Sequence, residues 1–561
     1  MKQDRRINPR PGEVIDRNKP ISFTWNGKKY TGFAGDTIVS ALIANGVEIF
    51  SRSFKYKRPR GVLSASFHDP NCTVQVDDEP NVRGAHRELQ AEMIIIPENV
   101  WPSLSFDVRS ANQTVSRFLS AGFYYKTFMK PQRLWPIYQK ILGRFAAGGI
   151  TSQDAEHGYY DKRYIHVDVC VAGGGPAGMS AAIAAAKSGA SVLLVEEEYE
   201  LGGHLRYGDE AALTTVSELR REVTALKNIE VLTNSAVTGR YDMNWLGVIQ
   251  RQPGISVKGH QLHERLCKVR AKTLVVAAGL IERPYVFAGN DLAGIILSTG
   301  VRRLLNLHSV LPGKNAVVFT ANQDGDACIA DLIKAGAVVR VVDARKGENI
   351  VQATGDKRIK TVELGDGQKI ACDLLVIAIG WTANVPLLNM AGDRPVYDKN
   401  SARFFPTNGL PENVLVTGGL IGDGSTNELI AHGAAIGTNA AARSDFGKAV
   451  TVPTLTREPH AELYRSTTHG FVDFSEDVSS KDLFAAKAEG YDSIELVKRY
   501  TTVTMGPSQG KLETVNAVAI MAEAHGVTDL NQIGTTVWRP PFVPITLGAL
   551  GGRGFENTRF S

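Results

Sequence analysis

The stretch HVDVCVAGGGPAG, His166 to Gly178, runs from an apolar β-type segment directly into a Gly-x-Gly-x-x-Gly turn. A helical run follows from Met179 to Ser188, and a second apolar run from Ser191 ends on Glu196. A strand, a glycine turn, a helix and a second strand closed by an acid about 20 residues past the first glycine make up the dinucleotide-binding fingerprint. The sequence therefore predicts a βαβ unit with a nucleotide site at the turn.

The glycines and the acid have separate roles in such a site. Gly173 permits the tight turn, Gly175 lets the backbone approach a pyrophosphate, and Gly178 lets helix and strand pack closely. The helix N-terminus offers unpaired N–H groups to the phosphates. Glu196 is expected to accept hydrogen bonds from ribose hydroxyls, which favours NAD or FAD over NADP because an acid repels a 2′-phosphate. The candidate cofactor-binding residues of this unit are Gly173, Gly175, Pro176, Ala177, Gly178, Glu196 and Glu197, with a solvated surface role as the alternative for Glu197.

Length and composition indicate a globular protein of several domains. The 561 residues exceed the size at which single cores stop growing, and 43% are hydrophobic and 22% charged. The net charge of +5 is small for this length and does not indicate nucleic-acid binding. The sequence contains neither an apolar stretch long enough for a membrane span nor the apolar core of a signal peptide, so no membrane association is expected.

Cysteine usage excludes some chemistry. The five cysteines form no C-x-x-C pair, which argues against a zinc site and a dithiol redox motif, so no metal-ligating residue is predicted. This usage fits a reducing cytoplasm.

Four regions follow one another along the chain. Residues 15–100 open with a hairpin around Asn26-Gly27 and continue as a small α+β domain. Residues 101–160, rich in aromatic and basic side chains, are interpreted as a connector that packs on other domains, with binding of single-stranded nucleic acid as the weaker alternative. Residues 161–445 form a large α/β body, and residues 451–561 contain short helical stretches and a Pro/Gly-rich tail.

A second βαβ unit is expected within the body, inserted at about residues 285–390. Its strand ends near Phe319, its helix covers 327–335, and its second strand ends on the acid Asp343. The turn between strand and helix, Thr320 to Gly325, keeps only the last of the three glycine positions. Side chains at the other two positions block a pyrophosphate, so this unit is expected to bind nothing or to bind weakly.

Two nucleotide folds, two strands that end in Ala-x-Gly and a late Gly-Asp after a strand resemble the two-dinucleotide-domain flavoproteins. The resemblance implies that Asp423 bonds the ribityl chain or the nicotinamide-side ribose and that the backbone of Val237 meets the adenine. It also places His204 near the pyrophosphate, although His204 is otherwise an ordinary surface histidine. Gly279 and Gly422 complete this set of candidates.

The flanking motifs sharpen the resemblance. Read in order along the whole chain, they are similar to the α subunit of heterotetrameric sarcosine oxidase. The motifs are Tyr30–Thr37, Arg52–Gly61, Trp101–Leu104, Ala121–Met129 and Val497–Thr502. The resemblance implies an α/β fold: a two-dinucleotide-binding flavoprotein body with an N-terminal ferredoxin-like α+β domain and a small C-terminal helical domain.

The same resemblance implies an enzyme that oxidises sarcosine or a related N-methyl amine to an imine and releases the one-carbon unit as formaldehyde or methylene-tetrahydrofolate. NAD is expected in this chain, FAD in a β subunit, and FMN at the interface between them, with small γ and δ subunits in the complex. No catalytic residue is expected in this chain. The candidates for the FMN phosphate are Lys498, Arg499, Thr501, Thr502 and Lys511, and a solvated basic turn is the equal alternative.

The chain departs from related proteins in two ways. The resemblance implies a folate-binding, aminomethyltransferase-like domain that residues 1–561 do not include, so tetrahydrofolate is expected on a separate chain or not at all. The positions of two iron–sulfur clusters in related dehydrogenases also lack their cysteines. The plant-type spacing C-x4-C-x2-C falls on Ser64, Asp69 and Cys72, and the C-terminal two-iron pattern falls on Asp473, Ser475, Ser508 and Glu513. Cluster-free domains favour an oxidase that delivers its electrons to O2 at a flavin.

Three alternatives remain open at this point. One is a stand-alone FAD-dependent NAD(P)H oxidoreductase, which the degraded second fold disfavours. Another is a subunit of an opine- or proline-type dehydrogenase. The last is a purely structural subunit that binds no nucleotide.

Overall fold

The computed structural model describes residues 5–104, 106–108, 121–122, 130–145, 149–150, 158–257, 259–466 and 468–552, without the side chains of 141–145. The chain divides into two compact units. Unit 1 comprises residues 1–151, 282–381 and 460–536, and unit 2 comprises residues 152–281, 382–459 and 537–561. The inserted nucleotide fold thus groups with the amino-terminal domain, and the tail from residue 537 groups with the first nucleotide fold.

A five-stranded sheet and one helix form the amino-terminal domain of unit 1. The strand order is β2-β1-β7-β5-β6. The predicted hairpin is confirmed: its turn residues Asn26 and Gly27 have φ values of 47° and 75°, the left-handed values that a two-residue turn requires. Thr37 caps the helix by accepting a hydrogen bond from the Ser40 N–H. The elements are β1 (Asp16–Trp25), β2 (Lys28–Ala34), α1 (Ile38–Ala44), β3 (Ser51–Arg52), β4 (Pro59–Arg60), β5 (Thr73–Val76), β6 (Glu79–Arg83) and β7 (Ile94–Pro97).

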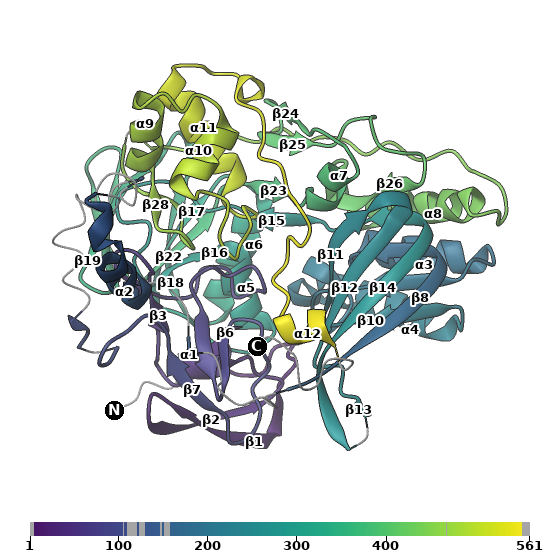
Figure 1. Cartoon of the computed structure of the whole chain (residues 1–561), viewed down its shortest axis with the longest axis horizontal. Helices are drawn as coiled ribbons and strands as arrows, with labels where there is room; N and C mark the ends of the chain where they lie inside the picture. The colour runs from purple at the N-terminus through teal and green to yellow at the C-terminus, as the bar shows by residue number, and fades with distance from the viewer. Residues whose placement is uncertain are drawn as a thin grey trace. The chain divides into compact units, whose positions relative to one another are not determined.

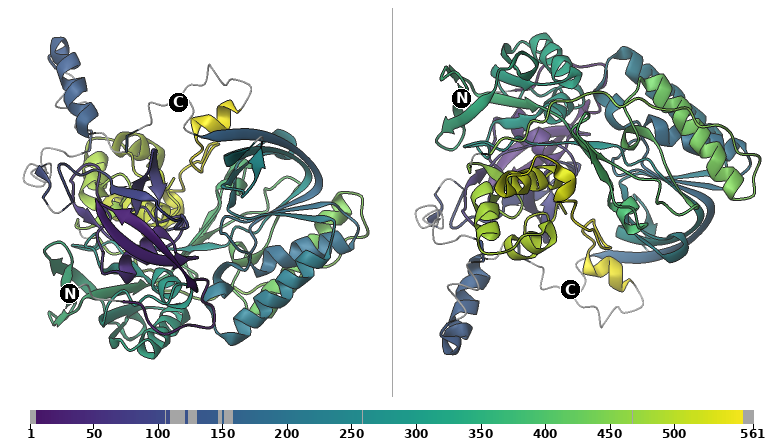
Figure 2. Two further views of the ribbon diagram at one scale, coloured as in Figure 1. Left: turned by 90° about the horizontal axis from the view of Figure 1, so that it is seen from below. Right: turned by 90° about the horizontal axis from the view of Figure 1, so that it is seen from above.

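Only parts of the predicted connector are described. Residues 109–120, 123–129, 146–148 and 151–157, which include most of the motif Ala121–Met129, lie outside the described residues. The connector contains helix α2 (Trp135–Phe145). No residue from 131 to 140 is buried, and Trp135 and Ile137 are 39% and 56% exposed. Figure 2 shows α2 extending away from the other elements of unit 1, so Trp135 and Ile137 are uncovered.

The second nucleotide fold of unit 1 is a four-stranded parallel sheet in the order β16-β22-β17-β18. The predicted βαβ unit is confirmed as β17 (Asn315–Thr320), α6 (Gln323–Lys334) and β18 (Val338–Asp343). Helix α6 begins four residues before the predicted start because the Asn322 side chain caps it by accepting from the Gly325 N–H. The other elements are β16 (Ile295–Leu297), α5 (Ser298–Asn306), β19 (Ile350–Gly355), β20 (Ile359–Leu364), β21 (Lys369–Ala371) and β22 (Leu374–Ala378), of which β19, β20 and β21 form an antiparallel sheet of their own.

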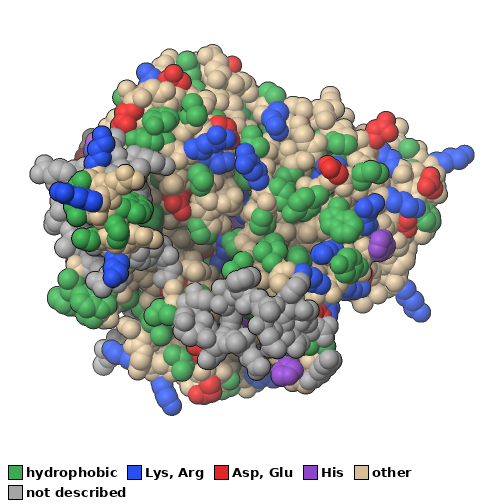
Figure 3. Space-filling view, in the orientation of Figure 1, with side chains coloured by type: hydrophobic (Ala, Val, Ile, Leu, Met, Phe, Trp, Pro, Cys, Tyr) green, Lys and Arg blue, Asp and Glu red, His purple; other side chains and the backbone are tan. Residues whose placement is uncertain are grey.

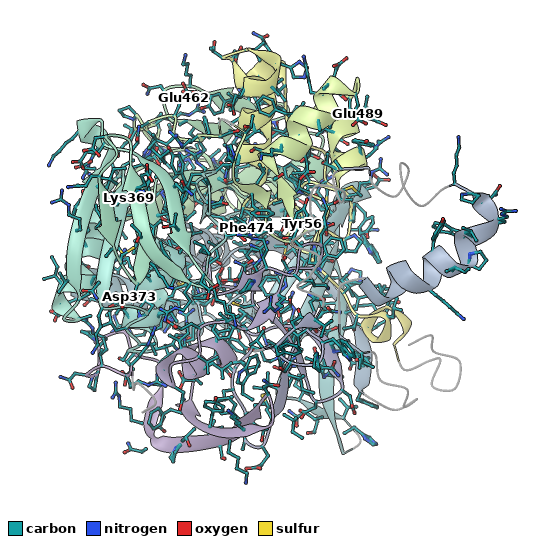
Figure 4. All side chains as sticks on the ribbon, turned by 90° about the vertical axis from the view of Figure 1, so that its left-hand side faces the viewer. Tyr56, Lys369, Asp373, Glu462, Phe474 and Glu489 are labelled. Carbon is teal, nitrogen blue, oxygen red and sulfur yellow. The ribbon has the colours of Figure 1, made fainter. Side chains whose placement is uncertain are left out.

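A hairpin and three helices form the carboxy-terminal domain of unit 1. They are β27 (Phe471–Asp473), β28 (Val478–Ser479), α9 (Ser480–Ala488), α10 (Ile494–Thr501) and α11 (Thr514–His525). Asp477, at the hairpin turn, is fully buried and accepts from the backbone N–H groups of Lys55 and Tyr56 at 2.9 and 3.0 Å. Asp477 also pairs with the buried Arg60. These contacts hold the domain against the segment Arg52–Gly61; Tyr56 and Phe474 mark this region in Figure 4.

An eight-stranded sheet is the centre of unit 2 (Figure 1). The pairs β10–β9, β9–β8 and β8–β14 are parallel, whereas the pairs β14–β12 and β12–β11 are antiparallel. Strands β13 and β26 both pair with β14. The elements are β8 (Tyr159–Ala172), α3 (Pro176–Lys187), β9 (Val192–Val195), α4 (Glu210–Ala225), β10 (Ile229–Leu232), β11 (Ser235–Tyr241), β12 (Trp245–Arg251), β13 (Ser256–Val257), β14 (His260–Val276), β26 (Val414–Val416) and α8 (Thr426–Arg443).

Helices α3 and α8 pack at unusually close range. A Cβ on Gly433 would lie 2.2 Å from the carbonyl oxygen of Ala177, and one on Gly437 would lie 2.0 Å from that of Ala181. Only glycine allows such an approach, because any side chain would collide with the backbone of α3. The packing therefore fixes the amino end of α3, where the predicted nucleotide site lies.

The remaining elements are short. They are β15 (Leu280–Glu282) with β23 (Trp381–Ala383), β24 (Val396–Asp398) with β25 (Arg403–Phe405), α7 (Pro386–Met390) and α12 (Leu547–Gly551). The tail docks on unit 2: the Phe542 N–H donates to the Thr238 carbonyl at 2.9 Å, and the Trp538 N–H donates to Asn389 at 3.1 Å. Among the helices that the structure describes, none combines the length and the apolar character needed to cross a bilayer.

Candidate functional site

The glycine turn after β8 is closed toward the protein and open at one position. Gly173 has a φ of 114°, and a Cβ there would lie 2.3 Å from the Ala277 carbonyl oxygen. A Cβ on Gly178 would lie 1.9 Å from the Gly173 carbonyl oxygen. A Cβ on Gly175, by contrast, would have no atom within 4 Å among the described residues. The open side at Gly175 is where a pyrophosphate must approach the backbone.

The amino end of α3 faces this open position. Gly175 is the N-cap, Pro176 takes the first helical turn, and no side chain of the described residues caps this end. Proline is well suited there because its missing N–H would have no partner inside the helix. The following N–H groups, including that of Ala177, are available to an anion, and the helix dipole favours negative charge at this end.

Glu196 ends β9 beside the turn and is 7% exposed. Its carboxylate accepts from the Gly174 N–H at 2.6 Å and from the Glu198 N–H at 2.9 Å. Burial raises the pKa of Glu196 to about 7, and the nearby Glu198 carboxylate adds to this effect. The two N–H donors hold the carboxylate against the glycine turn, and its contact with a ribose stays a prediction.

The other predicted residues of this site lie in unit 2 and differ in solvent exposure. Glu197 is half-buried, and His204 is exposed on the short helix η5 (Gly203–Tyr207). A Cβ on Gly203 would lie 3.1 Å from the Gly175 Cα, so η5 begins beside the turn. Val237 is buried on β11. Gly279 has a φ of 67° and open space where a Cβ would be.

Asp423 has a partner that the sequence does not reveal. Arg403, whose side chain is 2% exposed, donates two hydrogen bonds of 3.1 Å to the Asp423 carboxylate. The Glu458 N–H donates a third at 3.0 Å. Gly422, the preceding residue, is packed against Thr456, whose carbonyl oxygen would lie 2.5 Å from a Cβ. Most of the acceptor capacity of Asp423 is thus used inside the protein, and its contact with a ribose stays a prediction.

Two residues that shape the site were missed in the sequence. Ala277 supplies the carbonyl against which Gly173 packs, and the run of small residues from Ala277 to Gly279 after a strand is a signal that could have identified it. Arg403, which pairs with Asp423, lies in a stretch of sequence without a recognisable motif, so no local pattern predicts this pair.

The second nucleotide fold has acidic side chains at the start of its helix. Asp324 and Asp326 lie in the first turn of α6, and Trp381 donates its indole N–H to Asp324 at 3.1 Å. Arg345 pairs with both Asp326 and Asp343, the acid that ends β18. Two carboxylates at a helix N-terminus repel phosphate, and the terminal acid is already engaged. The local charge therefore opposes dinucleotide binding.

The candidates for the FMN phosphate belong to unit 1, and all except Lys511 lie at the end of α10. Lys498 and the exposed Arg499 lie in its last turn, and Thr502 follows with a φ of 69°. The buried Thr501 donates its hydroxyl to the Val497 carbonyl at 2.8 Å. Lys511 is also buried. The structure thus exposes Arg499 and Thr502 to a ligand and encloses Thr501 and Lys511.

Three family models match parts of the chain. A "2Fe-2S iron-sulfur cluster binding domain" matches residues 18–99, an "FAD dependent oxidoreductase" matches residues 168–224, and a "Sarcosine oxidase A3 domain" matches residues 467–553. These matches follow the same order as the ferredoxin-like domain, the nucleotide-binding body and the helical domain.

Curated relatives cover nearly the whole chain. It is 36% identical over 96% of its length to the sarcosine oxidase alpha subunit of Rhizobium meliloti (strain 1021). It is 31% identical over 97% of its length to the protein of the same name from Corynebacterium sp. (strain P-1). The chain spans 58% and 57% of the length of these two relatives. An opine oxidase subunit of Rhizobium meliloti (strain 1021) is 23% identical over 68% of the chain.

One solved structure matches the fold throughout. The L-proline dehydrogenase from P. horikoshii superposes with a TM-score of 0.73 at 18% identity and covers 97% of this chain and 99% of its own. Together with the family models, this confirms the predicted fold class: a flavoprotein-type α/β body with an amino-terminal ferredoxin-like domain.

Proposed function

The chain belongs to the family of sarcosine oxidase alpha subunits, and from this premise we propose that it is the NAD-holding subunit of a flavoenzyme that oxidises N-methyl amines such as sarcosine. The observation that carries the proposal is the contrast between the two nucleotide folds. The first is open at Gly175, whereas the second carries the carboxylates of Asp324 and Asp326 in the first turn of its helix. A chain that binds one nucleotide, while amine oxidation takes place on a partner subunit, accounts for the properties of both folds.

NAD is the nucleotide that we assign to the first fold. The open backbone at Gly175 and the free N–H groups of α3 suit a pyrophosphate. Glu196 suits a ribose with free hydroxyls and disfavours NADP. His204 and Val237 stay candidates for the pyrophosphate and adenine ends.

NAD affinity is expected to rise with pH through neutrality. The ionised Glu196 accepts ribose hydroxyls, so NAD binding favours the ionised form and lowers a pKa that burial has raised to about 7. Binding below that pKa releases a proton, and the dissociation constant should fall about tenfold between pH 6 and pH 8 and then level off. Calorimetric titration of the NAD-free chain measures this slope. The Glu196→Gln variant should show none, and an equal slope in both would contradict the role of Glu196.

A stand-alone NAD(P)H oxidoreductase fits the chain less well. Such an enzyme needs a second dinucleotide site for the reductant, and the acidic first turn of α6 opposes one. The five cysteines are all free and buried, which gives no support to a thiol relay. These free cysteines support a cytoplasmic location.

Turnover is assigned to a β-type subunit that holds FAD, with FMN between the two subunits. A flavin held there would supply the acceptor for the hydride of the N-methyl carbon, and O2 would be the final oxidant, reduced to hydrogen peroxide. Water converts the resulting imine to glycine and formaldehyde, or a folate-binding chain captures the carbon as methylene-tetrahydrofolate. In this chain, Arg499, Lys498 and Thr502 hold the FMN phosphate at the end of α10.

Partner subunits, including small γ and δ chains, are part of this proposal. The names of the relatives describe subunits, and the exposed Trp135 and Ile137 of α2 are available for a protein contact. Figure 3 shows positive, negative and apolar side chains interspersed on the face that it displays, which does not favour nucleic acid as a partner. A role within an opine- or proline-type dehydrogenase is the second candidate, favoured by the likeness to the opine oxidase subunit.

Purification of the complex through a tag on this chain tests the proposal. We expect the complex to consume O2 with sarcosine and to release formaldehyde and peroxide. Reversing the charges in Lys498→Glu/Arg499→Glu should lower the FMN content while the NAD content stays constant. Lys481→Glu, on the exposed surface of α9, is the matched control. Unchanged FMN in the double variant would remove Lys498 and Arg499 from the site, and a complex active on opines or proline alone would favour the second candidate.

A further inference from the structure

A single buried carboxylate organises the loop between β4 and β5. The Oδ2 atom of Asp69 accepts from the backbone N–H groups of Leu63, Ser64 and Ala65 at 2.8, 2.7 and 3.1 Å. Its Oδ1 atom accepts from the Asn71 N–H at 3.0 Å. Asp69 is 3% exposed, so four backbone donors and one carboxylate satisfy each other away from solvent.

The backbone around Asp69 has the form of an anion nest. Ala65 has a φ of 49°, a left-handed value that non-glycine residues rarely adopt. This value turns three consecutive N–H groups toward one point, and such a concavity binds anions. The loop geometry is therefore explained by an anion at its centre, and here the anion is a side chain of the loop itself.

This loop occupies the place of a cluster-binding loop. Residues 18–99 match a 2Fe-2S cluster-binding domain, and plant-type ferredoxins use the spacing C-x4-C-x2-C. Counted back from Cys72, that spacing falls on Asp69 and Ser64. Only one of the three positions is a thiol, and burial next to Asp69 raises the pKa of Cys72 well above its usual value. Within the described residues, no three histidine, cysteine or acidic side chains are placed to hold a metal ion. The residues therefore do not fit a cluster.

We propose that the Asp69 carboxylate takes the place of the iron–sulfur cluster as the anion that binds the N–H groups of this loop. Cluster sulfurs accept hydrogen bonds from backbone N–H groups, and a carboxylate can accept the same bonds with a negative charge of its own. The amino-terminal domain thereby keeps its loop conformation without metal. It serves as a scaffold rather than as a route for electrons.

The carboxy-terminal domain repeats the arrangement. Asp473, at a position that resembles a cluster ligand, is fully buried and accepts from the N–H groups of Glu476 and Thr504 at 3.0 and 2.8 Å. Glu513 and Ser508, at two further positions that resemble cluster ligands, are also buried. Burial and the nearby Asp473 charge both raise the pKa of Glu513. A buried carboxylate again binds backbone N–H groups, here from two segments, at a position that resembles a cluster ligand.

Chemical rescue tests the proposal in the full chain. Asp69→Ala removes the anion and leaves four buried donors unpaired, so the midpoint of thermal unfolding should fall by about 5 °C or more. Formate at about 0.1 M, which can enter the emptied nest, should restore at least half of this shift, whereas chloride at equal ionic strength should not. Asp78→Ala, an exposed aspartate of the same domain, is the matched control and should show neither effect.

Two further measurements make every outcome informative. If Asp69→Ala does not accumulate as folded protein, Asp69→Asn keeps a carbonyl acceptor without the charge and should unfold at an intermediate temperature that formate does not change. Iron and acid-labile sulfide in the native complex are expected to be absent from this chain. An unfolding midpoint equal to that of Asp78→Ala, rescue by chloride as strong as by formate, or stoichiometric iron and sulfide bound to this chain would each overturn the proposal.

Discussion

A Gly175→Val variant is expected to lose its nucleotide without losing its fold. Gly175 has an ordinary extended backbone (φ −69°, ψ −179°), and a Cβ there meets no described atom within 4 Å. A side chain at this position fills only the space from which a pyrophosphate approaches the helix. We expect NAD affinity to fall by a factor of about 100 or more, equivalent to about 3 kcal/mol, with the unfolding midpoint unchanged. Equilibrium dialysis and thermal unfolding measure the two quantities.

Two other glycines provide the controls. Gly409→Val, in an exposed loop of unit 2, should retain both the nucleotide and stability. Gly173→Ala should misfold, because its Cβ would lie 2.3 Å from the Ala277 carbonyl oxygen and its φ of 114° strains any side chain. Retention of NAD by Gly175→Val would mean that the nucleotide does not bind across this turn.

An Asp423→Ala variant is expected to lose about 3 to 5 kcal/mol of stability. Arg403 is buried, with its side chain 2% exposed, and loses both charged hydrogen bonds when the carboxylate is removed. The Phe405 ring, at 4.5 Å, and the attraction of the Asp398 carboxylate do not replace these two hydrogen bonds. Denaturant titration of the isolated chain measures the loss.

The pair Lys187–Glu222, also in unit 2, is the control for this variant. Its side chains are 58% and 41% exposed, and Glu222→Ala should cost less than about 1 kcal/mol. Arg403→Met combined with Asp423→Ala should be more stable than Asp423→Ala alone, because it removes the unpaired charge. If Asp423→Ala instead keeps its stability and loses NAD, then Asp423 acts mainly on the nucleotide.

The site around Gly175 could be predicted because its signals are local. The apolar run before Gly173, the glycine spacing and the terminal Glu196 all lie within one βαβ unit, and the structure places them as expected. Even here the start of α3 was predicted three residues too late, at Met179. The helix begins at Pro176, because proline is favoured in the first turn, whereas Gly175 and Gly178 on either side suggest a turn in the sequence.

Features that depend on distant residues could not be predicted. The bidentate contact of Arg403 with Asp423 joins residues 20 positions apart through a turn and two short strands. Strand β12 pairs antiparallel with β11 and β14, on the side of β14 that the parallel strand β8 does not cover. Nothing in the sequence of β12 predicts this direction of pairing. Asp69 was identified only as a missing ligand, because the convergence of four N–H groups depends on the loop conformation.

These features lead to one view of the molecule. The first nucleotide fold has open space at Gly175, and the second has acidic side chains in the first turn of its helix. At both sites that resemble cluster sites, a buried carboxylate accepts hydrogen bonds from backbone N–H groups. A chain with this arrangement holds a nucleotide and supports partners, and the redox chemistry that we propose takes place at a flavin outside its own nucleotide folds.

Identifying the nucleotide that the isolated chain releases is the sharpest test of this view. The chain would be produced without partners, purified, denatured and analysed by chromatography and mass spectrometry. We expect a colourless protein that releases NAD in equimolar amount. A yellow protein that releases FAD, or a folded protein that releases no nucleotide and binds no NAD, would contradict the assignment of NAD to the first fold.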